Sequence, residues 1–143
     1  TGTLRLLRTE SDILPVDREN AFELSIASVP SGKVENQSVK VAMRSVFKLF
    51  WRPEGLPGDP LEAYQQLRWT RNSQGVQLTN PTPYYINLIQ VSVNGKALSN
   101  VGVVPPKSQR QTSWCQAIAP CHVAWRAIND YGGLSAKKEQ NLP

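Results

Sequence analysis

The sequence contains few of the side chains that enzymes and metal sites use. Its 143 residues include one histidine, His122, and two cysteines. No HExxH motif, phosphate-binding glycine loop or nucleophile elbow is present. A catalytic or metal-binding site needs several such groups close together. The composition therefore predicts a protein that is not an enzyme and that binds no metal or cofactor.

Long hydrophobic runs are also missing. No apolar stretch approaches the roughly 18 residues of a membrane span, so the sequence predicts no membrane insertion. The chain does not open with the charged and then apolar pattern of a signal peptide. Its first residues, 1–7, are instead typical of the middle of a domain, so we expect the chain to begin inside a domain.

The positive charge is not clustered. The formal net charge is +5, but the basic residues are scattered among Asp and Glu, and only Lys137 and Lys138 are adjacent. No nucleic-acid-binding motif accompanies them. Because net charge reports on solubility and loose association more than on fold, the pattern favours a basic soluble protein over a nucleic-acid binder.

Cys115 and Cys121 are separated by Gln-Ala-Ile-Ala-Pro. This spacing is that of neither a CxxC redox pair nor a zinc knuckle. We predict a local disulfide across the mouth of a hairpin, which indicates an oxidising compartment. Two free thiols are the alternative.

Short alternating segments between turn residues predict an all-β chain. The predicted strands are 3–7, 21–29, 39–53, 67–71, 76–80, 84–93, 101–104, 109–115 and 121–129. Asn94-Gly95 is the sequence of a tight hairpin turn. Strand spacing of this kind is typical of a β-sandwich of the immunoglobulin (Ig) type.

The strand predicted over 39–53 is unusually long, since the mean strand has about 5–6 residues. One face carries apolar residues and the other carries basic residues. The apolar set is Val39, Val41, Met43, Phe47, Leu49 and Trp51, and the basic set is Lys40, Arg44, Lys48 and Arg52. A strand of this length either spans two structural units or has a spare edge to offer a partner.

Residues 52–60 hold three prolines and two glycines, which predicts a domain boundary. We place the hinge at 54–60, with Asp59, Pro60 and Glu62 beginning a short helical turn. Residues 61–143 supply six predicted strands, enough for a complete small Ig-like domain. Residues 1–53 supply three, which cannot cover both faces of a core. They are predicted to be the last strands of a partial Ig-like domain.

Five motifs in a fixed order carry a family resemblance over nearly the whole chain. They are Asp17-Arg18-Glu19, Val29-Pro30, Lys48-Leu49-Phe50-Trp51-Arg52-Pro53, Asn80-Pro81-Thr82-Pro83-Tyr84-Tyr85 and Ile128-Asn129-Asp130-Tyr131-Gly132. In these motifs the chain resembles the PapD-like periplasmic pilus-assembly chaperones of Gram-negative bacteria. The family's first strands of domain one have no counterpart in this sequence.

The resemblance implies a non-enzymatic chaperone of two Ig-like domains in the periplasm. Such a chaperone binds pilin (fimbrial) subunits by lending them the last strand of its first domain, and then delivers them to an outer-membrane usher. Main-chain hydrogen bonds give affinity in this β-augmentation, and alternate side chains give fit. The matching donor residues are Val39, Val41 and Met43. Their alternative role is ordinary packing in the core of a sandwich, because the alternation of apolar and polar residues indicates, before anything else, a strand with one buried face.

Lys48 matches the family lysine that binds the C-terminal carboxylate of the subunit through a charge-assisted hydrogen bond. Alternation puts Lys48 on the face opposite the donor residues. Either a bulge or strong twist intervenes, or the two sets serve different faces of the strand. A solvated surface lysine is the alternative.

Glu19, Arg52 and Asp130 match family charges that link the two domains across the hinge. The planar guanidinium of Arg suits a position where two carboxylates converge. The alternative is three unrelated surface charges, each contributing roughly 0–1 kcal/mol.

A second function class remains open, because fold does not fix function. The chain is then a self-contained Ig-like adhesion or structural module, which needs neither a carboxylate-binding lysine nor a donor strand. For the chaperone interpretation, the absent first strands are on a second chain, cleaved away or never made.

Overall fold

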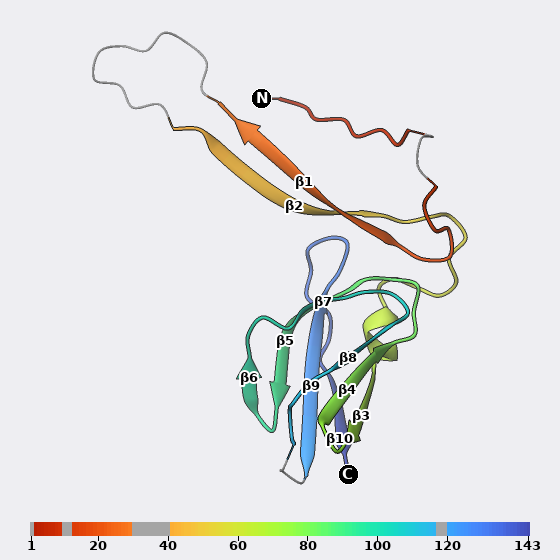
Figure 1. Ribbon diagram of the computed structural model, residues 1–143, viewed down its shortest axis with the longest axis vertical. Helices are drawn as coiled ribbons and strands as arrows, with labels where there is room; N and C mark the ends of the chain where they lie inside the picture. The colour runs from red at the N-terminus through yellow and green to blue at the C-terminus, as the bar shows by residue number, and fades with distance from the viewer. Residues whose placement is uncertain (1, 10–12, 30–40, 117–119) are drawn as a thin grey trace.

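The computed structural model describes residues 2–9, 13–29, 41–116 and 120–143. These residues form ten strands and one short 3-10 helix, so the all-β prediction is confirmed (Figure 1). Within the described ranges, no helix is long and apolar enough to cross a membrane.

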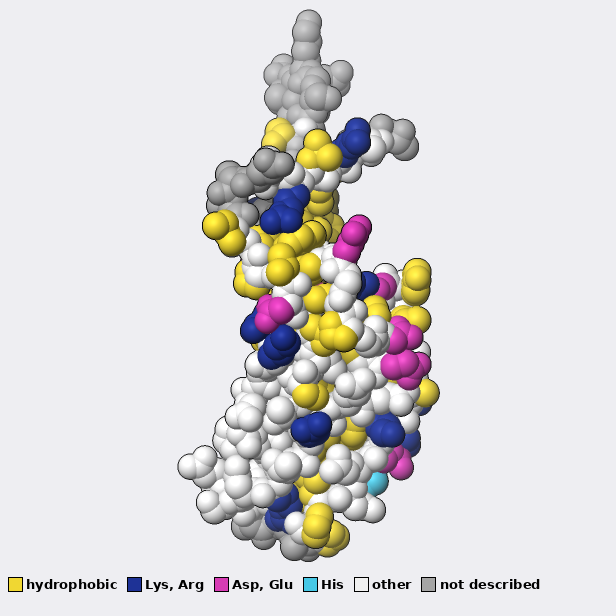
Figure 2. Space-filling model, turned by 90° about the vertical axis from the view of Figure 1, so that its right-hand side faces the viewer, with side chains coloured by type: hydrophobic (Ala, Val, Ile, Leu, Met, Phe, Trp, Pro, Cys, Tyr) yellow, Lys and Arg dark blue, Asp and Glu magenta, His cyan; other side chains and the backbone are white. Residues whose placement is uncertain are grey.

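A separate antiparallel hairpin precedes the sandwich. It consists of β1 (Asn20–Ser28) and β2 (Met43–Trp51). The ladder runs without a register shift from Asn20 opposite Trp51 to Ser28 opposite Met43. The hairpin projects from one end of the molecule, and hydrophobic side chains gather on its surface (Figures 1 and 2).

The other eight strands form a sandwich of two sheets. One sheet has the order β3-β4-β8, with β3 at Arg68–Asn72, β4 at Gly75–Asn80 and β8 at Ser108–Gln111. The other has the order β10-β9-β5-β6, with β10 at Lys138–Leu142, β9 at Cys121–Ile128, β5 at Ile86–Val93 and β6 at Lys96–Leu98. β7 (Gly102–Val104) pairs with the same edge of β5 as β6 does: β7 lies opposite residues 86–88 and β6 opposite residues 91–93.

The hydrophobic core lies between these two sheets. Trp69 of β3 and Trp125 of β9 are each 1% exposed, and their ring centroids are 5.1 Å apart. The indole N–H of Trp125 donates to the carbonyl of Tyr64 at 2.8 Å. Tyr64 belongs to the 3-10 helix η1 (Ala63–Gln66), which is thereby held against the core. Each large apolar side chain buried in this way contributes roughly 1.5–3 kcal/mol to folding.

The structure corrects the prediction of a strand over 3–7. Residues 2–9 join no ladder, and Leu4 and Leu7 are 60% and 73% exposed. Alternation alone does not make a strand, because its backbone groups need a neighbouring strand to pair with. The segment instead contacts the hairpin, where the Arg8 guanidinium lies 4.0 Å from the ring centroid of Trp51.

The long strand predicted over 39–53 is shorter than expected. The ladder begins at Met43 and ends at Trp51, so Val41 and Ala42 lie outside it. Val39 lies outside the described residues.

The strand predicted over 109–115 stops at Gln111. Cys115 has a φ of 56°, which an extended strand cannot contain. At the same end, the Thr112 carbonyl oxygen lies 2.3 Å from where a Cβ on Gly75 would be, so only glycine fits there.

Two strands of the sandwich were not predicted, β6 and β10. Asn94 (φ 51°) and Gly95 (φ 79°) form the predicted hairpin turn, which leads into β6. The helical turn begins at Ala63, later than predicted. Asp59 caps the preceding turn instead, with its Oδ1 accepting from the Leu61 N–H at 2.9 Å.

The predicted disulfide between Cys115 and Cys121 is present, with the two Cα atoms 6.0 Å apart. It does not close a hairpin, because β8 pairs with β4 while β9 pairs with β5 and β10. The bond connects the segment after β8 to the first residue of β9, and so links the two sheets.

We expect the double variant Cys115→Ala/Cys121→Ala to stay folded but to lose about 2 kcal/mol of unfolding free energy, the chain-entropy value for so short a loop. Urea denaturation measures this loss. A reductant should lower the urea midpoint of the unaltered protein and should not change the urea midpoint of the variant. Native protein that labels with a thiol reagent would contradict the disulfide.

Candidate functional site

The base of the hairpin meets the loops at one end of the sandwich (Figure 1). Glu19 precedes β1 and Arg52 follows β2. Because Asn20 pairs with Trp51, the antiparallel register places Glu19 beside Arg52. Asp130 follows the end of β9 by two residues. Three segments far apart in the sequence therefore converge at this point.

Arg52 connects the two predicted carboxylates. Its Nε donates to Glu19 Oε2 at 3.0 Å, and its Nη1 and Nη2 donate to the Asp130 carboxylate at 2.8 and 3.0 Å. This is the two-carboxylate arrangement for which a planar guanidinium is suited. We call Glu19, Arg52 and Asp130 the hinge cluster. The structure brings the three side chains together, and their role between the domains stays a prediction.

Glu19 is also bonded to the sandwich through its backbone and its second oxygen. Its N–H donates to the Pro83 carbonyl at 2.8 Å, and its Oε1 accepts from the Tyr85 N–H at 2.6 Å. The residue is only 4% exposed. A buried carboxylate is costly unless its oxygens are paired, and here each oxygen has a donor.

The surroundings shift the acidities of the cluster in opposite directions. Burial raises the pKa of the Glu19 carboxyl, against the lowering effects of the Tyr85 N–H and Arg52. Hydrogen bonds from Arg52 lower the pKa of Asp130. The pKa of Arg52 is raised, mainly by its hydrogen bonds to Asp130. Arg52 therefore stabilises the charged form of both carboxylates.

Two further contacts join the hairpin segment to the sandwich, and sequence reasoning missed both. Lys107 Nζ lies 3.1 Å from Asp17 Oδ2, and the rings of Phe50 and Tyr85 have centroids 5.0 Å apart. Hydrogen bonds from Arg18, and then from Lys107, lower the pKa of Asp17. Asp17 lies in the first motif, but nothing in the sequence pattern identifies Lys107 as its partner.

A hollow of about 400 Å³ opens between the hairpin base and the sandwich loops. Its lining residues are Glu19, Phe50, Arg52, Tyr85, Asn87, Ile128, Asn129 and Asp130. Phe50 and Arg52 share one face of β2 and its continuation, since their positions differ by two. Lys48 is two residues earlier and belongs to the same face.

Lys48 is exposed and makes no ion pair or side-chain hydrogen bond with any described residue. The β1–β2 ladder contains no bulge, so Lys48 and Met43 are on opposite faces of the strand. The bulge considered from the sequence is therefore wrong. Val41 and Met43 are 65% and 67% exposed, so neither packs in a core of the described chain.

The edges of β2 differ. Along one edge it pairs with β1, and in the described part of the chain no strand pairs with the other. That second edge presents backbone N–H and C=O groups in the arrangement that an incoming strand would need.

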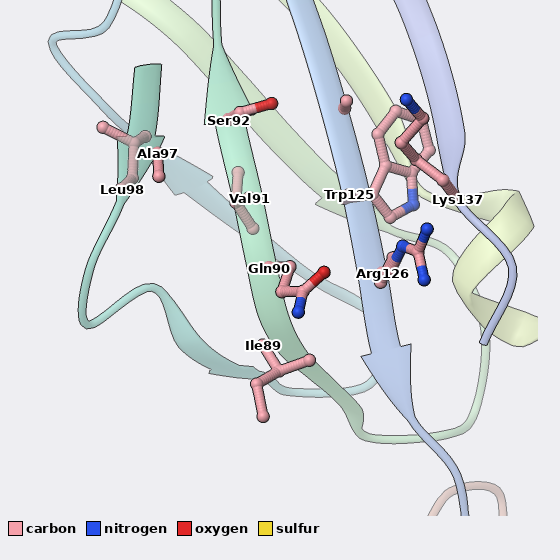
Figure 3. A pocket seen from close by; sticks show the side chains of 10 residues that line it. Ile89, Gln90, Val91, Ser92, Ala97, Leu98, Trp125, Arg126 and Lys137 are labelled. Carbon is pink, nitrogen blue, oxygen red and sulfur yellow. The ribbon is translucent and has the colours of Figure 1, made fainter. Parts of the chain in front are cut away.

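A second hollow of about 400 Å³ lies on the outer face of the β10-β9-β5-β6 sheet (Figure 3). Ser92 and Ala97 line it, together with Ile89, Arg126 and Lys137. It contains none of the predicted site residues. Among the residues that the structure describes, no group of three or more His, Cys, Asp or Glu side chains could hold a metal ion.

Comparison with known families finds two matches that together cover most of the chain. Residues 62–139 match the model described as Pili assembly chaperone PapD, C-terminal domain. Residues 1–57 match the model described as Pili and flagellar-assembly chaperone, PapD N-terminal domain.

Individual relatives agree with these matches. The fimbrial chaperone YcbF of Escherichia coli (strain K12) is 99% identical over 143 residues, which are 100% of this chain and 61% of YcbF. The chaperone FimC of the same strain is 34% identical over 95% of this chain and 57% of its own length. A chain in the solved complex of the Salmonella enterica SafA pilin with the SafB chaperone is 29% identical, with a TM-score of 0.74, over 91% of this chain and 62% of that one.

We expect Arg52→Ala to broaden the range of angles between hairpin and sandwich, because it leaves two carboxylates without the cation that joins them. Solution X-ray scattering measures this as a larger radius of gyration and a less defined pair-distance function. The matched control is Arg18→Ala, since among the described residues the Arg18 guanidinium bonds only to its neighbour Asp17. An Arg52→Ala profile equal to that of the unaltered protein would reduce the hinge cluster to surface charge.

The cluster also predicts a pH dependence. The pKa of Asp130 is lowered in the folded protein, so this carboxylate stabilises the fold above its unfolded pKa of about 3.9, and the stabilisation is lost on acidification. The pKa of Glu19 is raised, so ionisation of this carboxyl lowers the stability of the fold as the pH rises. Arg52→Ala removes the first effect and enlarges the second. The variant should therefore lose more unfolding free energy at pH 7 than at pH 3.

Urea unfolding of Arg52→Ala and of the unaltered protein at the two pH values measures this difference. Arg126→Ala is the control, because Arg126 has no ion-pair partner among the described residues. An Arg52→Ala loss that is equal at both pH values would contradict the electrostatic role of Arg52.

Proposed function

Because the chain belongs to the PapD-like family of pilus-assembly chaperones, we propose that the protein binds pilin subunits by donor-strand complementation and delivers them to an outer-membrane usher. The chain spans about 61% of the length of its E. coli relative, so these activities are proposed for the whole protein. The proposed location is the periplasm, where a disulfide such as Cys115–Cys121 persists. The proposed role involves no catalysis.

One observation supports strand donation more than any other. β2 has an unpaired edge in the described chain, and exposed apolar side chains at Val41 and Met43 lie at its start. In β-augmentation the free edge supplies main-chain hydrogen bonds and alternate side chains fill pockets of the partner. We propose that these two residues, with Val39 outside the described range, enter the open groove of a pilin that lacks a strand.

Lys48 is proposed to bind the C-terminal carboxylate of the subunit. It is exposed, forms no ion pair with Glu23, which lies opposite it on β1, and shares its face of β2 with Phe50 and Arg52. An ammonium group in this position can donate a charge-assisted hydrogen bond to a carboxylate. The two faces of β2 then act differently: the odd-numbered face fits the groove and the even-numbered face binds the chain end.

We further propose the hinge cluster as the connection that fixes the angle between the two domains. The proposed limits are 1–53 for the partial first domain, 54–60 for the hinge and 61–143 for the second domain. A second chain carrying the first strands of domain one remains a proposed partner. The hairpin, with large side chains such as Phe22 and Phe47 exposed, has surface for those strands to cover.

The alternative is a self-contained Ig-like adhesion or structural module. Every described feature that fits this alternative also fits the chaperone proposal. An adhesion module does not use the edge of β2 or Lys48. A capture experiment with pilin therefore separates the two functions.

We expect two substitutions to weaken pilin capture by the full-length E. coli relative that is 99% identical to this chain. Val41→Glu should weaken it on the order of a hundredfold or more, because a charge in an apolar groove loses its hydration without a partner. Lys48→Ala should weaken it about 10- to 100-fold through loss of a charge-assisted hydrogen bond. Titration calorimetry or pull-down with E. coli pilin subunits measures both.

The matched control is Ile89→Glu, which adds the same charge at a half-exposed apolar position on the sandwich. It should leave capture unchanged. The 143-residue chain alone should hold pilin more weakly than the full-length protein, since its donor strand must be ordered on binding. If the Val41→Glu and Lys48→Ala variants both capture pilin as well as the unaltered protein, donor-strand complementation through β2 and the residues just before it is wrong.

A further inference from the structure

The loop between β9 and β10 is held in one shape by a single side chain. Asn129 Oδ1 accepts from the N–H groups of Tyr131 and Gly133 at 3.0 and 2.9 Å. Two backbone bonds close the same loop: the Asn129 N–H donates to the Gly133 carbonyl at 2.9 Å, and the Gly132 N–H donates to the Asn129 carbonyl at 3.0 Å. Four hydrogen bonds over five residues leave this loop little freedom.

The two glycines of the loop are required by its geometry. Gly132 has a φ of 76°, a conformation that side chains disfavour. A Cβ on Gly133 would lie 3.1 Å from the Asn129 amide nitrogen. The chain thus uses both glycines to bring its backbone around Asn129, and the loop is ordered before any partner binds.

This rigid loop exposes an aromatic ring. Tyr131 is 86% exposed, and Leu134, paired with Ile128 in an isolated bridge, is 44% exposed. The Tyr131 ring packs against no described aromatic or cationic side chain. A Tyr side chain loses little entropy on binding and combines an apolar body with a polar tip, which makes it common at binding hot spots.

The loop rises from the sandwich toward the β1–β2 hairpin (Figure 1). The residues just before Tyr131, Ile128 to Asp130, line the hollow at the hairpin base together with Phe50 and Arg52. Arg52 bonds directly to Asp130, so the base of β2 and the loop are fixed to each other. Tyr131 is the residue that follows this lining, and its loop is bonded to the base of β2 through Asp130.

We propose that Tyr131 and Leu134 form a second contact surface for the pilin subunit, on the sandwich. This inference rests on the proposed function, and it names a part of the subunit-binding surface beyond the donor strand and Lys48. A subunit that pairs with β2 and places its chain end near Lys48 lies in the angle between hairpin and sandwich. There it meets the ring of Tyr131, whose loop is held in shape by Asn129 and is bonded to Arg52 through Asp130.

The test compares three variants of the full-length E. coli relative for pilin affinity by titration calorimetry. Tyr131→Ala should bind about 5- to 30-fold more weakly, the effect of losing a hot-spot aromatic. Tyr131→Phe should bind within about twofold of the unaltered protein, since the apolar body remains. The matched control Ile89→Ala truncates a 50% exposed apolar side chain in the hollow of Figure 3 and should have no effect. Thermal unfolding of each variant confirms that the fold is kept.

A photoreactive phenylalanine analogue at position 131 tests the same contact directly. Irradiation of the chaperone–pilin complex should yield a covalent chaperone–pilin adduct. An adduct with an outer-membrane protein in place of pilin, or no adduct, overturns the inference.

The outcomes separate the two proposals. If the unaltered chaperone and Tyr131→Ala capture pilin equally well, the contact surface is wrong while donor-strand complementation stands. If the unaltered chaperone captures no pilin, the proposed function fails and this inference fails with it.

Discussion

The bidentate pairing of Arg52 with Asp130 is the interaction on which the arrangement of the described chain depends. The same guanidinium bonds to Glu19, so one side chain joins the start of β1, the end of β2 and the loop after β9. Exposed ion pairs contribute little to stability, but Glu19 is buried and Asp130 belongs to a loop with its own hydrogen bonds. In its proposed role, Arg52 acts mainly by fixing the orientation of the three segments that it joins.

The hairpin shows the opposite physical situation. A two-stranded sheet is at best marginally stable in water, and both faces of this one carry exposed apolar residues such as Phe22, Val46 and Phe47. An open edge with apolar side chains is a liability for aggregation unless another strand covers it. For a protein that lends a strand to a partner, the same features are the binding surface. In the proposed function, the hairpin is attached at its base while the second edge of β2, unpaired among the described residues, stays available to the partner.

The sequence predicted what depends on local chemistry and missed what depends on distant partners. Alternation located most strands, and Asn94-Gly95 located a hairpin turn because both residues accept positive φ. β10 (Lys138–Leu142) was missed because its first four residues are all polar and show no alternation, and the segment becomes a strand by pairing with β9. Residues 3–7 show the reverse: they have an apolar pattern, but no described strand pairs with them. The hinge cluster was found through motifs and not through charge spacing, and Lys107 lay outside those motifs.

The register of the hairpin gives the two faces of β2 separate surroundings. Because the ladder has no bulge, the odd-numbered side chains never turn toward the face of Lys48, Phe50 and Arg52. That second face continues through the Phe50–Tyr85 ring contact and the Arg52–Asp130 pair into the loop of the sandwich. In the proposed function, a subunit pairs with the free edge of β2 and takes the odd-numbered side chains into its groove, and contacts on the second face position it. The position of the bound subunit then depends on the hinge cluster, because the cluster determines where the loop lies relative to β2.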